Sequence, residues 1–562
     1  MGVSMDSLYR AITAVNNVLW HDAVLYVILA VGLLLIVWTK FGPLVALTHG
    51  IHVIRGKFDK KDDPGAISHF QALSAALSAT VGLGNIGGVA VAISLGGPGA
   101  IFWMWVVGVI GMALKMTEVT QSMLYRHTED PDNPHGGPMF VVSHGLRQMS
   151  PSLAGLGRWI GYVFCVTVMI SAVTGGNMFQ AWNVGTVTQL NFGVPALLTG
   201  VVLAVITALV IIGGIKRIGA VASKLVPLMC GFYLIAGLYV LLLNLGDIPD
   251  VMRLIFVSAF SPTEAQGAFT GGTLGYAFLW GMKRALFSNE AGQGSAPIAH
   301  AAARTDEPVR EGIVAGLEPF IDTILVCTLT ALVILLSGAW NRPPAARFDS
   351  APQVIEVGPG RWTLESPPLP GESESAWVPG QTVFMLLDTG TVNPQTGSSL
   401  VEFHGTVVDT SDGPAVSWNT YAGDVAPVPQ EGIYVVYTGA SLTSHAFDRV
   451  RPGLGRWLVT LASWLFAIST MISWSYYGEQ GVVFMLGAKW VRLYKAIYCL
   501  LIVVATSGFI TTDQELDAFT SLGTGVMLFA NIPIILIFSK QTMDKYHEYM
   551  GRLKSGQMQR TS

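Results

Sequence analysis

Long apolar runs separated by short polar loops make up most of the chain. A bilayer core requires about 20 predominantly apolar residues per helix, and eleven runs come near or exceed that length. They cover residues 22–39, 70–97, 99–125, 158–186, 194–214, 218–245, 272–303, 312–340, 455–484, 491–511 and 517–539. We therefore predict an all-α integral membrane protein with eleven transmembrane helices. The odd number places the two termini on opposite faces of the membrane.

Residues 341–450 follow a different pattern. Short alternating runs, such as Gln381 to Leu387 and Gly432 to Thr438, are separated by Gly, Pro and Asp turns, which is typical of β-strands. The segment carries 12 of the 28 prolines, 12 acidic residues, four arginines and no lysine. We predict a small β-rich extracytoplasmic insert between the eighth and ninth spans. It is either a solubilising or assembly domain or a vestibule that captures substrate.

Lysine and arginine predict the orientation, because they are enriched in cytoplasmic loops. Of the 32 basic residues, 21 fall on the loops of one face, including five after residue 539. We predict an N-terminus outside, a C-terminus inside and a cytoplasmic tail at residues 540–562. The expected location is a bacterial-type cytoplasmic (inner) membrane.

The composition excludes several classes of protein. Hydrophobic residues make up 51% of the chain and charged residues 12%, against about 25% charged in soluble proteins. This rules out a soluble enzyme, a nucleic-acid-binding protein and a disordered scaffold. All four cysteines lie in apolar runs, and the chain has no HExxH or GxSxG motif. We expect no enzymatic activity, no organic cofactor and no nucleic-acid partner.

Two of the predicted spans are interrupted by residues that a plain lipid-facing helix would not contain. The second span includes the run from Gly82 to Gly88, and the seventh includes the run from Phe287 to Pro297. Small residues in a membrane helix often mean close helix packing. However, matching interruptions in two halves of a chain indicate a transporter binding site.

The positions of the interruptions also predict the domain organisation. Each interrupted span is the first of five consecutive predicted spans, and the two sets of five have opposite orientations in the membrane. The first repeat is expected at residues 70–245, and the second at 272–340 and 455–539, on either side of the insert. Residues 1–69 then form an N-terminal region with one extra span.

Several motifs resemble the alanine or glycine:cation symporter family, also called sodium:alanine symporters. They are Gly82-Leu-Gly-Asn-Ile-Gly-Gly-Val-Ala, Gly96-Gly-Pro-Gly-Ala-Ile-Phe-Trp-Met-Trp105, Lys115-Met-Thr-Glu118-Val119, Phe287-Ser-Asn-Glu-Ala-Gly292 and Ser473-Trp-Ser-Tyr-Tyr-Gly-Glu479. The resemblance covers the chain except the insert, and implies a leucine-transporter-like fold with two inverted five-helix repeats. It implies sodium-coupled import of small neutral amino acids, alanine and glycine, by alternating access. Gln293 departs from the family pattern, where an aliphatic residue is more usual, and could change the shape of the pocket.

A zwitterionic substrate needs partners for its carboxylate and its ammonium group, and a broken helix offers free N–H and C=O groups for both. We expect amides around Gly84, Asn85 and Gly87 to bind the carboxylate. Carbonyls near Phe287, Ser288 and Asn289 should meet the ammonium. The remaining expected substrate contacts are Gln180, as a side-chain acceptor, and Trp474, which forms a wall together with Phe287. Interhelical hydrogen bonding and ordinary packing are the alternatives for these two side chains.

The resemblance also implies a sodium site. Its carbonyl ligands would come from around Ala79 and Gly82, with the hydroxyls of Ser469 and Thr470 closing the site. Sodium is thus the expected coupling ion, with no other metal and no cofactor. Serine and threonine in membrane helices commonly bond their own backbone instead.

Alternatives remain for the coupling ion, the substrate and the role. A proton-coupled carrier, a carrier of D-serine or glutamine, and a transporter-like amino-acid sensor all stay open. No histidine lies centrally in a predicted span, which weakens the case for a histidine proton relay. Lys115 and Glu118 have i, i+3 spacing and are expected to pair on one helix face. The intramembrane charges either form structural ion pairs or take part in gating or in ion coupling.

Overall fold

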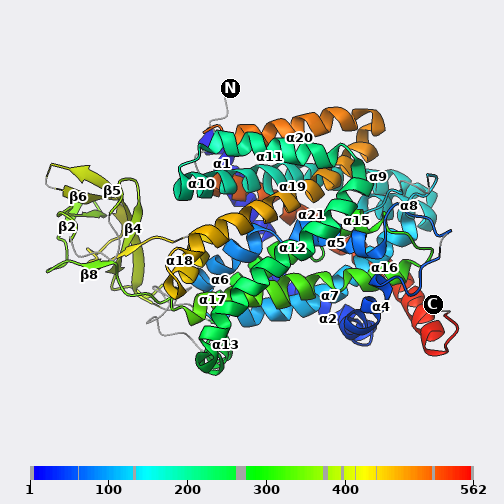
Figure 1. The fold of residues 1–562 in the computed structure, drawn as a ribbon, viewed down its shortest axis with the longest axis horizontal. Helices are drawn as coiled ribbons and strands as arrows, with labels where there is room; N and C mark the ends of the chain where they lie inside the picture. Colours follow the sequence, from blue (N-terminus) through cyan, green and yellow to red (C-terminus); the bar gives the residue numbers. More distant parts are fainter. Residues whose placement is uncertain are drawn as a thin grey trace.

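The computed structural model describes residues 5–60, 62–130, 134–260, 274–370, 377–393, 398–411, 413–437, 439–508 and 513–558. A body of packed helices carries a small β domain at one end, and the C-terminus lies toward the opposite end (Figure 1). The helical body and the β domain correspond to the two parts of the chain that the sequence pattern distinguishes, the apolar runs and the insert.

The helices of the body are mostly long, and short π-helical segments interrupt several of them. The α-helices are α1 (Met5–Leu19), α2 (Asp22–Trp38), α3 (Gly42–Val45), α4 (Ile51–Ile54), α5 (His69–Thr80), α6 (Val89–Gly96), α7 (Ala100–Tyr125), α8 (Pro138–Met149), α9 (Ala154–Val173), α10 (Phe179–Phe192), α11 (Ala196–Ile211), α12 (Gly214–Leu243), α13 (Ile248–Phe260), α14 (Leu274–Asn289), α15 (Ala296–His300), α16 (Pro308–Ala315), α17 (Thr328–Leu336), α18 (Ala440–Val450), α19 (Leu454–Leu486), α20 (Val491–Ala505) and α21 (Asp513–Lys554). The π-helical segments are Ala46–Gly50, Gly84–Gly88, Thr174–Met178 and Phe320–Cys327.

Seven helical stretches among the described residues are long and apolar enough to cross a membrane. They are Arg10–Trp38, Gly99–Tyr125, Pro151–Phe192, Gly214–Leu243, Pro308–Leu336, Leu454–Leu486 and Ala518–Lys554. Helix α5 and the stretch Gly84–Gly96 make an eighth candidate that is bent by 53°. The predicted spans at 194–214, 272–303 and 491–511 contain the shorter helices α11, α14 and α20. The protein is therefore a mostly helical membrane protein with seven or eight candidate spans by length.

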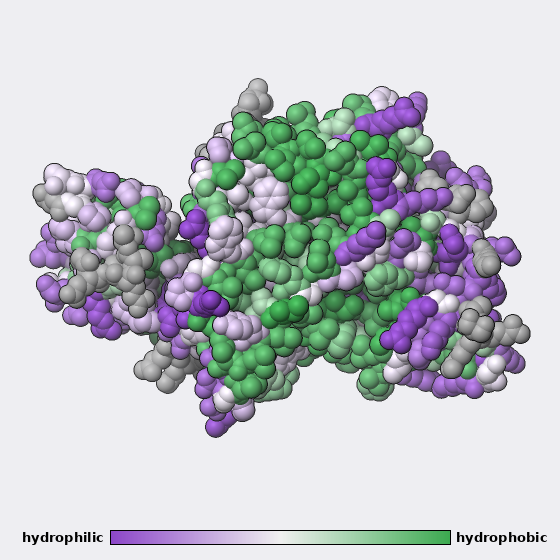
Figure 2. Space-filling model, in the orientation of Figure 1, coloured by the Kyte–Doolittle hydropathy of each residue, from purple (hydrophilic) through white to green (hydrophobic). Residues whose placement is uncertain are grey.

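The outer surface of the body suits a lipid environment. A hydrophobic band covers its middle, and hydrophilic residues gather on the β domain and at the opposite end (Figure 2). Large apolar side chains in this band are exposed, such as Leu34 on α2, Leu209 on α11 and Ile235 on α12. Exposure of so much apolar surface is expected where lipid, not water, surrounds the protein.

The last helix continues past the predicted end of the final span at residue 539. Helix α21 passes through Pro533 and ends at Lys554. The part of α21 after residue 539 is amphipathic. Met543, Tyr546 and Tyr549 on its apolar face are buried. The Tyr549 hydroxyl lies 2.7 Å from Nε2 of His49. Most of the predicted tail is thus a helix docked on the body, because one of its faces is apolar.

The insert forms a small β domain, as the alternating pattern predicts. Its strands are β1 (Ala346–Arg347), β2 (Val354–Gly358), β3 (Arg361–Leu364), β4 (Thr382–Asp388), β5 (Leu400–Thr410), β6 (Gly413–Trp418), β7 (Tyr421–Ala422) and β8 (Val428–Val435). An antiparallel five-stranded sheet has the order β1-β8-β4-β5-β6, and a second sheet has the order β2-β3-β7. Val383, Met385, Phe403 and Val407 are buried in its core.

The insert ends in helix α18, which belongs structurally to the helical body. Leu442 and Phe447 on α18 are buried among residues of the membrane helices. The Thr443 hydroxyl donates a 2.9 Å hydrogen bond to the carbonyl of Ile86, inside the π-helical segment Gly84–Gly88. The segment that follows the β domain is therefore fixed directly to the interrupted helix.

These contacts predict which part of the insert can be removed. Ala346 and Ile433 are directly paired partners on neighbouring antiparallel strands, so an Asn-Gly turn can connect them in place of residues 347–432. We expect this variant to insert and to elute as a single species in detergent, because α18 and its buried contacts remain. A second variant that also lacks residues 440–450 should aggregate, because it exposes the surface beneath Phe447. Aggregation of the first variant would show that the β domain itself is required for folding.

Candidate functional site

The first interruption lies between α5 and α6. Val81, directly after α5, is extended (φ −76°, ψ 94°), and the π-helical segment Gly84–Gly88 follows before α6 begins. The Asn85 side chain stabilises the break, because its Oδ1 accepts a 2.8 Å hydrogen bond from the amide of Gly82. A backbone amide that the helix leaves free is thus satisfied inside the protein, as membrane depth requires.

The second interruption lies between α14 and α15. Glu290, Gly292 and Gly294 adopt positive φ angles of 54°, 80° and 80°. The Glu118 carboxylate on α7 accepts hydrogen bonds from the amides of Gly292 (3.4 Å) and Gly294 (3.1 Å). Asn531 on α21 donates to the same carboxylate at 2.8 Å. Three donors from two elements therefore converge on one buried acid and hold the turn open.

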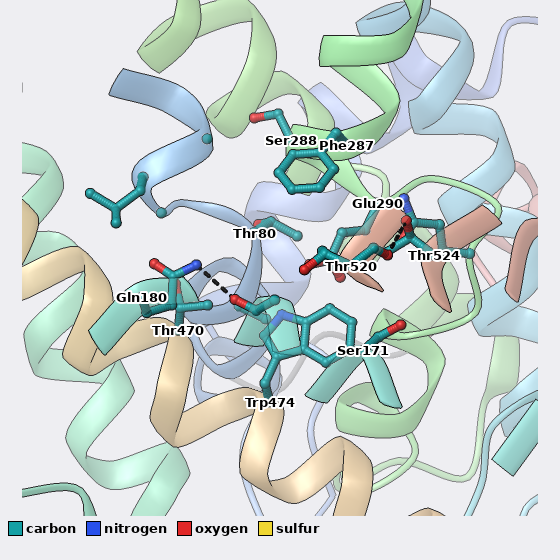
Figure 3. A pocket seen from close by; sticks show the side chains of 16 residues that line it. Thr80, Ser171, Gln180, Phe287, Ser288, Glu290, Thr470, Trp474, Thr520 and Thr524 are labelled. Carbon is teal, nitrogen blue, oxygen red and sulfur yellow. Dashed lines mark hydrogen bonds between the residues drawn. The ribbon is translucent and has the colours of Figure 1, made fainter. Parts of the chain in front are cut away.

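A small pocket lies between the two interruptions. Figure 3 shows Phe287 and Trp474 on opposite sides of it. Its complete lining is Ala79, Thr80, Gly82, Leu83, Gly84, Ser171, Gly175, Gln180, Phe287, Ser288, Glu290, Gln293, Thr470, Trp474, Thr520 and Thr524. Gly84 and Gly175 come from π-helical segments, which often occur at functional sites.

Eight of the twelve site residues expected from the sequence lie in this lining. They are Ala79, Gly82, Gly84, Gln180, Phe287, Ser288, Thr470 and Trp474. They come from four separated stretches of the chain, so the fold brings together residues that lie up to several hundred positions apart in the sequence.

The other four expected residues lie outside the lining. Asn85 and Asn289 are completely buried, and the Asn289 amide donates to the Thr323 hydroxyl at 3.1 Å. Gly87 packs against α18, since a Cβ on it would lie 3.0 Å from the amide nitrogen of Ala440. The Ser469 hydroxyl lies 2.6 Å from that of Ser78 on α5. These four residues therefore contact other parts of the protein and do not line the pocket.

Four oxygen atoms in the lining have no hydrogen-bond partner among the described residues, although they are buried. They are Oγ of Ser171, Oε1 of Gln180, Oε1 of Gln293 and Oγ1 of Thr470. A buried polar atom without a partner is costly, and native proteins rarely leave one unless a ligand completes it. The pocket is therefore lined with unused acceptors, which suits a cationic group or a metal ion.

Comparison with known sequences identifies the family. The profile of the sodium:alanine symporter family matches residues 5–363 and 428–562. The sodium/alanine symporter AgcS of Methanococcus maripaludis is 36% identical over 490 residues, which cover 87% of this chain and 86% of AgcS. The amino-acid carrier protein AlsT of Bacillus subtilis is 28% identical over 557 residues, covering 98% and 94%.

The chain belongs to the sodium:alanine symporter family. It is therefore a multi-pass membrane amino-acid carrier and not an enzyme. Among solved structures, MhsT in complex with L-phenylalanine matches at a TM-score of 0.45 and 14% identity, over 84% of this chain and 89% of MhsT. The family profile leaves out residues 364–427, which form the larger part of the β domain.

Three hydroxyl residues of the pocket are not among those expected from the sequence. Ser171, Thr520 and Thr524 line the cavity from α9 and α21. Each is a small hydroxyl residue inside an apolar run, and such residues occur in most membrane helices, so the sequence carries no signal that selects them. Gln293 differs in the sequence only as a departure from the family pattern, and it also lines the pocket.

A chain of buried ionisable side chains lies behind the second interruption. His69 contacts Glu311, whose other oxygen lies 2.5 Å from Nδ1 of His300. Nε2 of His300 lies 2.7 Å from Glu318, which also accepts a 3.2 Å hydrogen bond from Lys115. All five side chains are at most 1% exposed. The chain connects the start of α5 to α7, α15 and α16.

This chain corrects one sequence expectation and adds to another. Lys115 pairs with Glu318 on another element instead of with Glu118, because Glu118 faces the amides of the second interruption. His69 begins α5 and His300 ends α15, so neither lies centrally in a span, yet His300 is completely buried between two carboxylates. Both pairings depend on tertiary contacts that i, i+3 spacing does not encode.

The buried pair predicts a large effect on stability. Lys115→Met removes one of the two bases that contact the fully buried carboxylate of Glu318; loss of a partner from a buried ion pair typically costs about 3–5 kcal/mol, and we expect the lower end of this range because His300 remains. Lys60→Met is the matched control, because Lys60 pairs with Asp306 on the surface, with 63% and 45% of their side chains exposed, and such pairs contribute about 0–1 kcal/mol. Unfolding in mixed detergent micelles measures both free energies. Equal losses for the two variants would contradict a structural role for the buried pair.

Proposed function

We propose that this carrier is a sodium-coupled symporter that imports small neutral amino acids, alanine and glycine, by alternating access. The proposed architecture is leucine-transporter-like, with eleven spans, two inverted five-helix repeats, an outside N-terminus and a cytoplasmic C-terminus. The observation that carries the proposal is a pocket between two interrupted helices that contains four buried oxygens with no hydrogen-bond partner among the residues that the structure describes. The names of AgcS, a sodium/alanine symporter, and AlsT, an amino-acid carrier protein, support it.

The pocket offers chemistry for both ends of an amino acid. The backbone at Gly84 faces the ring of Phe287, since a Cβ on Gly84 would lie 3.7 Å from that ring. Amides at this break would bind the substrate carboxylate. The ammonium group would lie near Oε1 of Gln180, whose amide nitrogen is fixed by a 3.0 Å hydrogen bond to the carbonyl of Gly175. Phe287 and Trp474 leave little room for a long side chain, which favours alanine and glycine.

The sodium site would lie at the same break, beside α19. Thr470 directs its hydroxyl at Gly82, because a Cβ on Gly82 would lie 2.9 Å from Oγ1 of Thr470. Hard cations take oxygen ligands, and unwound carbonyls in broken membrane helices are known sources of them. Carbonyls around Ala79 and Gly82, with the Thr470 hydroxyl, would supply such a set, and Ser469 would support it through its contact with Ser78.

The driving force is adequate for one sodium ion per substrate. Moving one charge inward gains about 2.3 kcal/mol per 100 mV, and a tenfold sodium gradient adds about 1.4 kcal/mol. Together these support accumulation of a neutral substrate by roughly several hundred-fold. A proton as the coupling ion is the second candidate, and the buried chain from His69 to Lys115 is the observation that favours it.

Uptake into proteoliposomes tests the coupling ion. With the full chain reconstituted, an inward sodium gradient should drive accumulation of labelled alanine, and glycine should compete for it. A pH gradient without sodium should leave the alanine at equilibrium with the bath. Accumulation driven by the pH gradient alone would replace sodium by the proton, and binding of alanine without any movement would indicate a sensor.

Thr470 provides a more specific test of the sodium site. Thr470→Val keeps the shape of the side chain but removes the oxygen, and should raise the sodium concentration for half-maximal uptake at least tenfold. Thr470→Ser should retain most of the affinity because it keeps the hydroxyl. Ser475→Ala on the same helix is the control, since its hydroxyl bonds the carbonyl of Ile472 within α19. An unchanged sodium dependence in Thr470→Val would refute the assignment.

A further inference from the structure

Two of the buried pocket oxygens that lack a partner have no role in the proposed transport cycle. That cycle uses Oε1 of Gln180 for the substrate ammonium and Oγ1 of Thr470 for sodium, which leaves Oγ of Ser171 and Oε1 of Gln293. Both residues line the pocket, and neither atom has a hydrogen-bond partner among the described residues. A buried acceptor without a partner costs free energy, so such an atom calls for a donor that arrives with the ligand.

Gln293 lies in the second interruption, on backbone that several contacts hold in place. It stands between Gly292 and Gly294, which both have a φ of 80°, and the amides of these two glycines bond the Glu118 carboxylate. The backbone amide of Gln293 donates to the carbonyl of Glu290 at 3.1 Å. Its side chain is completely buried. The position of this residue is therefore set before any ligand binds.

The side-chain amide of Gln293 has a fixed orientation. Its Nε2 donates a 2.8 Å hydrogen bond to the carbonyl of Leu286 on α14. A carbonyl accepts but cannot donate, so turning the amide over would place two acceptors against each other. Oε1 is the atom that remains unused. Gln293 thus offers the ligand an acceptor that an O–H or N–H group can satisfy and a methyl group cannot.

Ser171 does not offer an equivalent acceptor. Its hydroxyl on α9 packs against Gly523 of α21, where an added Cβ would overlap Oγ. A serine hydroxyl also rotates, and it can bond a carbonyl of its own helix. Of the two atoms, Oε1 of Gln293 is therefore the one whose direction is fixed.

The walls of the pocket limit which donor can reach this acceptor. Phe287 and Trp474 lie on opposite sides of the pocket (Figure 3), so a long side chain has little room. Alanine and glycine have no side-chain donor, and Oε1 of Gln293 would stay unpaired with either of them bound. Serine has the carbon skeleton of alanine and adds one hydroxyl, which is the smallest side chain that can donate.

We propose that this carrier selects serine above alanine, and that Oε1 of Gln293 accepts a hydrogen bond from the substrate hydroxyl. The inference rests on the proposed function, because it adds a side-chain subsite to the same pocket. A site that hydrogen-bonds a substrate hydroxyl discriminates against the analogue that lacks it, because the buried acceptor is then left unpaired. One such bond is worth about tenfold in affinity. Threonine should bind more weakly than serine, because its additional methyl group needs space between the two aromatic walls.

Serine and 2-aminobutyrate test the subsite, because their side chains are nearly equal in size and differ by a hydroxyl against a methyl group. Each competes with labelled alanine for sodium-driven uptake into proteoliposomes that contain the full chain. We expect half-maximal inhibition at an about tenfold lower concentration of serine than of 2-aminobutyrate. A pocket without an acceptor for the hydroxyl would favour 2-aminobutyrate, because burying an unpaired hydroxyl is costly.

The outcomes separate this inference from the proposed function. Sodium-driven accumulation of alanine with equal inhibition by the two competitors, or stronger inhibition by 2-aminobutyrate, would overturn the serine subsite and leave the symporter assignment standing. A sodium gradient that accumulates neither labelled alanine nor labelled serine would overturn both.

Gln293→Met assigns the hydrogen bond to this side chain. Methionine has a similar length but no oxygen, so the inhibition ratio of the two competitors should fall to about one or invert. Gln557→Met makes the same change at an exposed position and should keep the wild-type ratio. A wild-type ratio in Gln293→Met would overturn the assignment. Equal weakening of serine, 2-aminobutyrate and alanine would show that Gln293 holds the ammonium group, and the inference would be wrong. The wild-type comparison tests the proposal even if this variant does not fold.

Discussion

A helix that stops inside a membrane exposes backbone N–H and C=O groups where no water can bind them. Every one of these groups must find a partner within the protein, and this requirement organises the centre of the molecule. At the first interruption the partner is Asn85, which bonds the amide of Gly82. At the second it is Glu118, which bonds the amides of Gly292 and Gly294. The carbonyl of Ile86 is satisfied from outside by Thr443 of α18. The pocket exists because other elements hold the two breaks open at these points.

The same constraint accounts for how the charges are arranged. Lys115, His69 and His300 are not scattered through the body but lie in one continuous chain with Glu311 and Glu318. Each acid in this chain contacts two bases, so the cost of burying it is shared by two partners. The chain links the start of α5 and α7 to α15 and α16, the two helices that follow the second interruption. Movement of these elements relative to one another therefore has to break or re-form buried ion pairs as a group.

The local sequence predicts the features of the fold and of the pocket that depend on neighbouring residues in the chain. Glycines inside apolar runs predicted both interruptions, because glycine at membrane depth is a poor choice for an uninterrupted helix, and alternating runs predicted β4 and β8 in the insert. The sequence also predicts the pocket residues that carry a distinctive side chain, such as Gln180 and Trp474. Hydroxyls that resemble many others, such as Ser171 and Thr520, were not. The partner of Lys115 could not be predicted either, because spacing on one helix says nothing about which neighbouring helix brings Glu318 within reach.

The charge balance of the interior explains why a cation and a neutral amino acid would bind together. Among the described residues, Glu118, Glu290 and Asp322 have no ion pair with a base, since Lys115, His69 and His300 pair with Glu311 and Glu318. The pocket therefore lies beside three buried carboxyl groups in a medium of low dielectric constant, where electrostatic interactions are strong. In the proposed cycle the bound ion relieves their charge and makes the site receptive to the substrate carboxylate, while the carboxylate in turn stabilises the ion. Because coupling between two ligands is reciprocal, an electrostatic interaction shared by the ion and the substrate carboxylate would couple an ion gradient to amino-acid uptake.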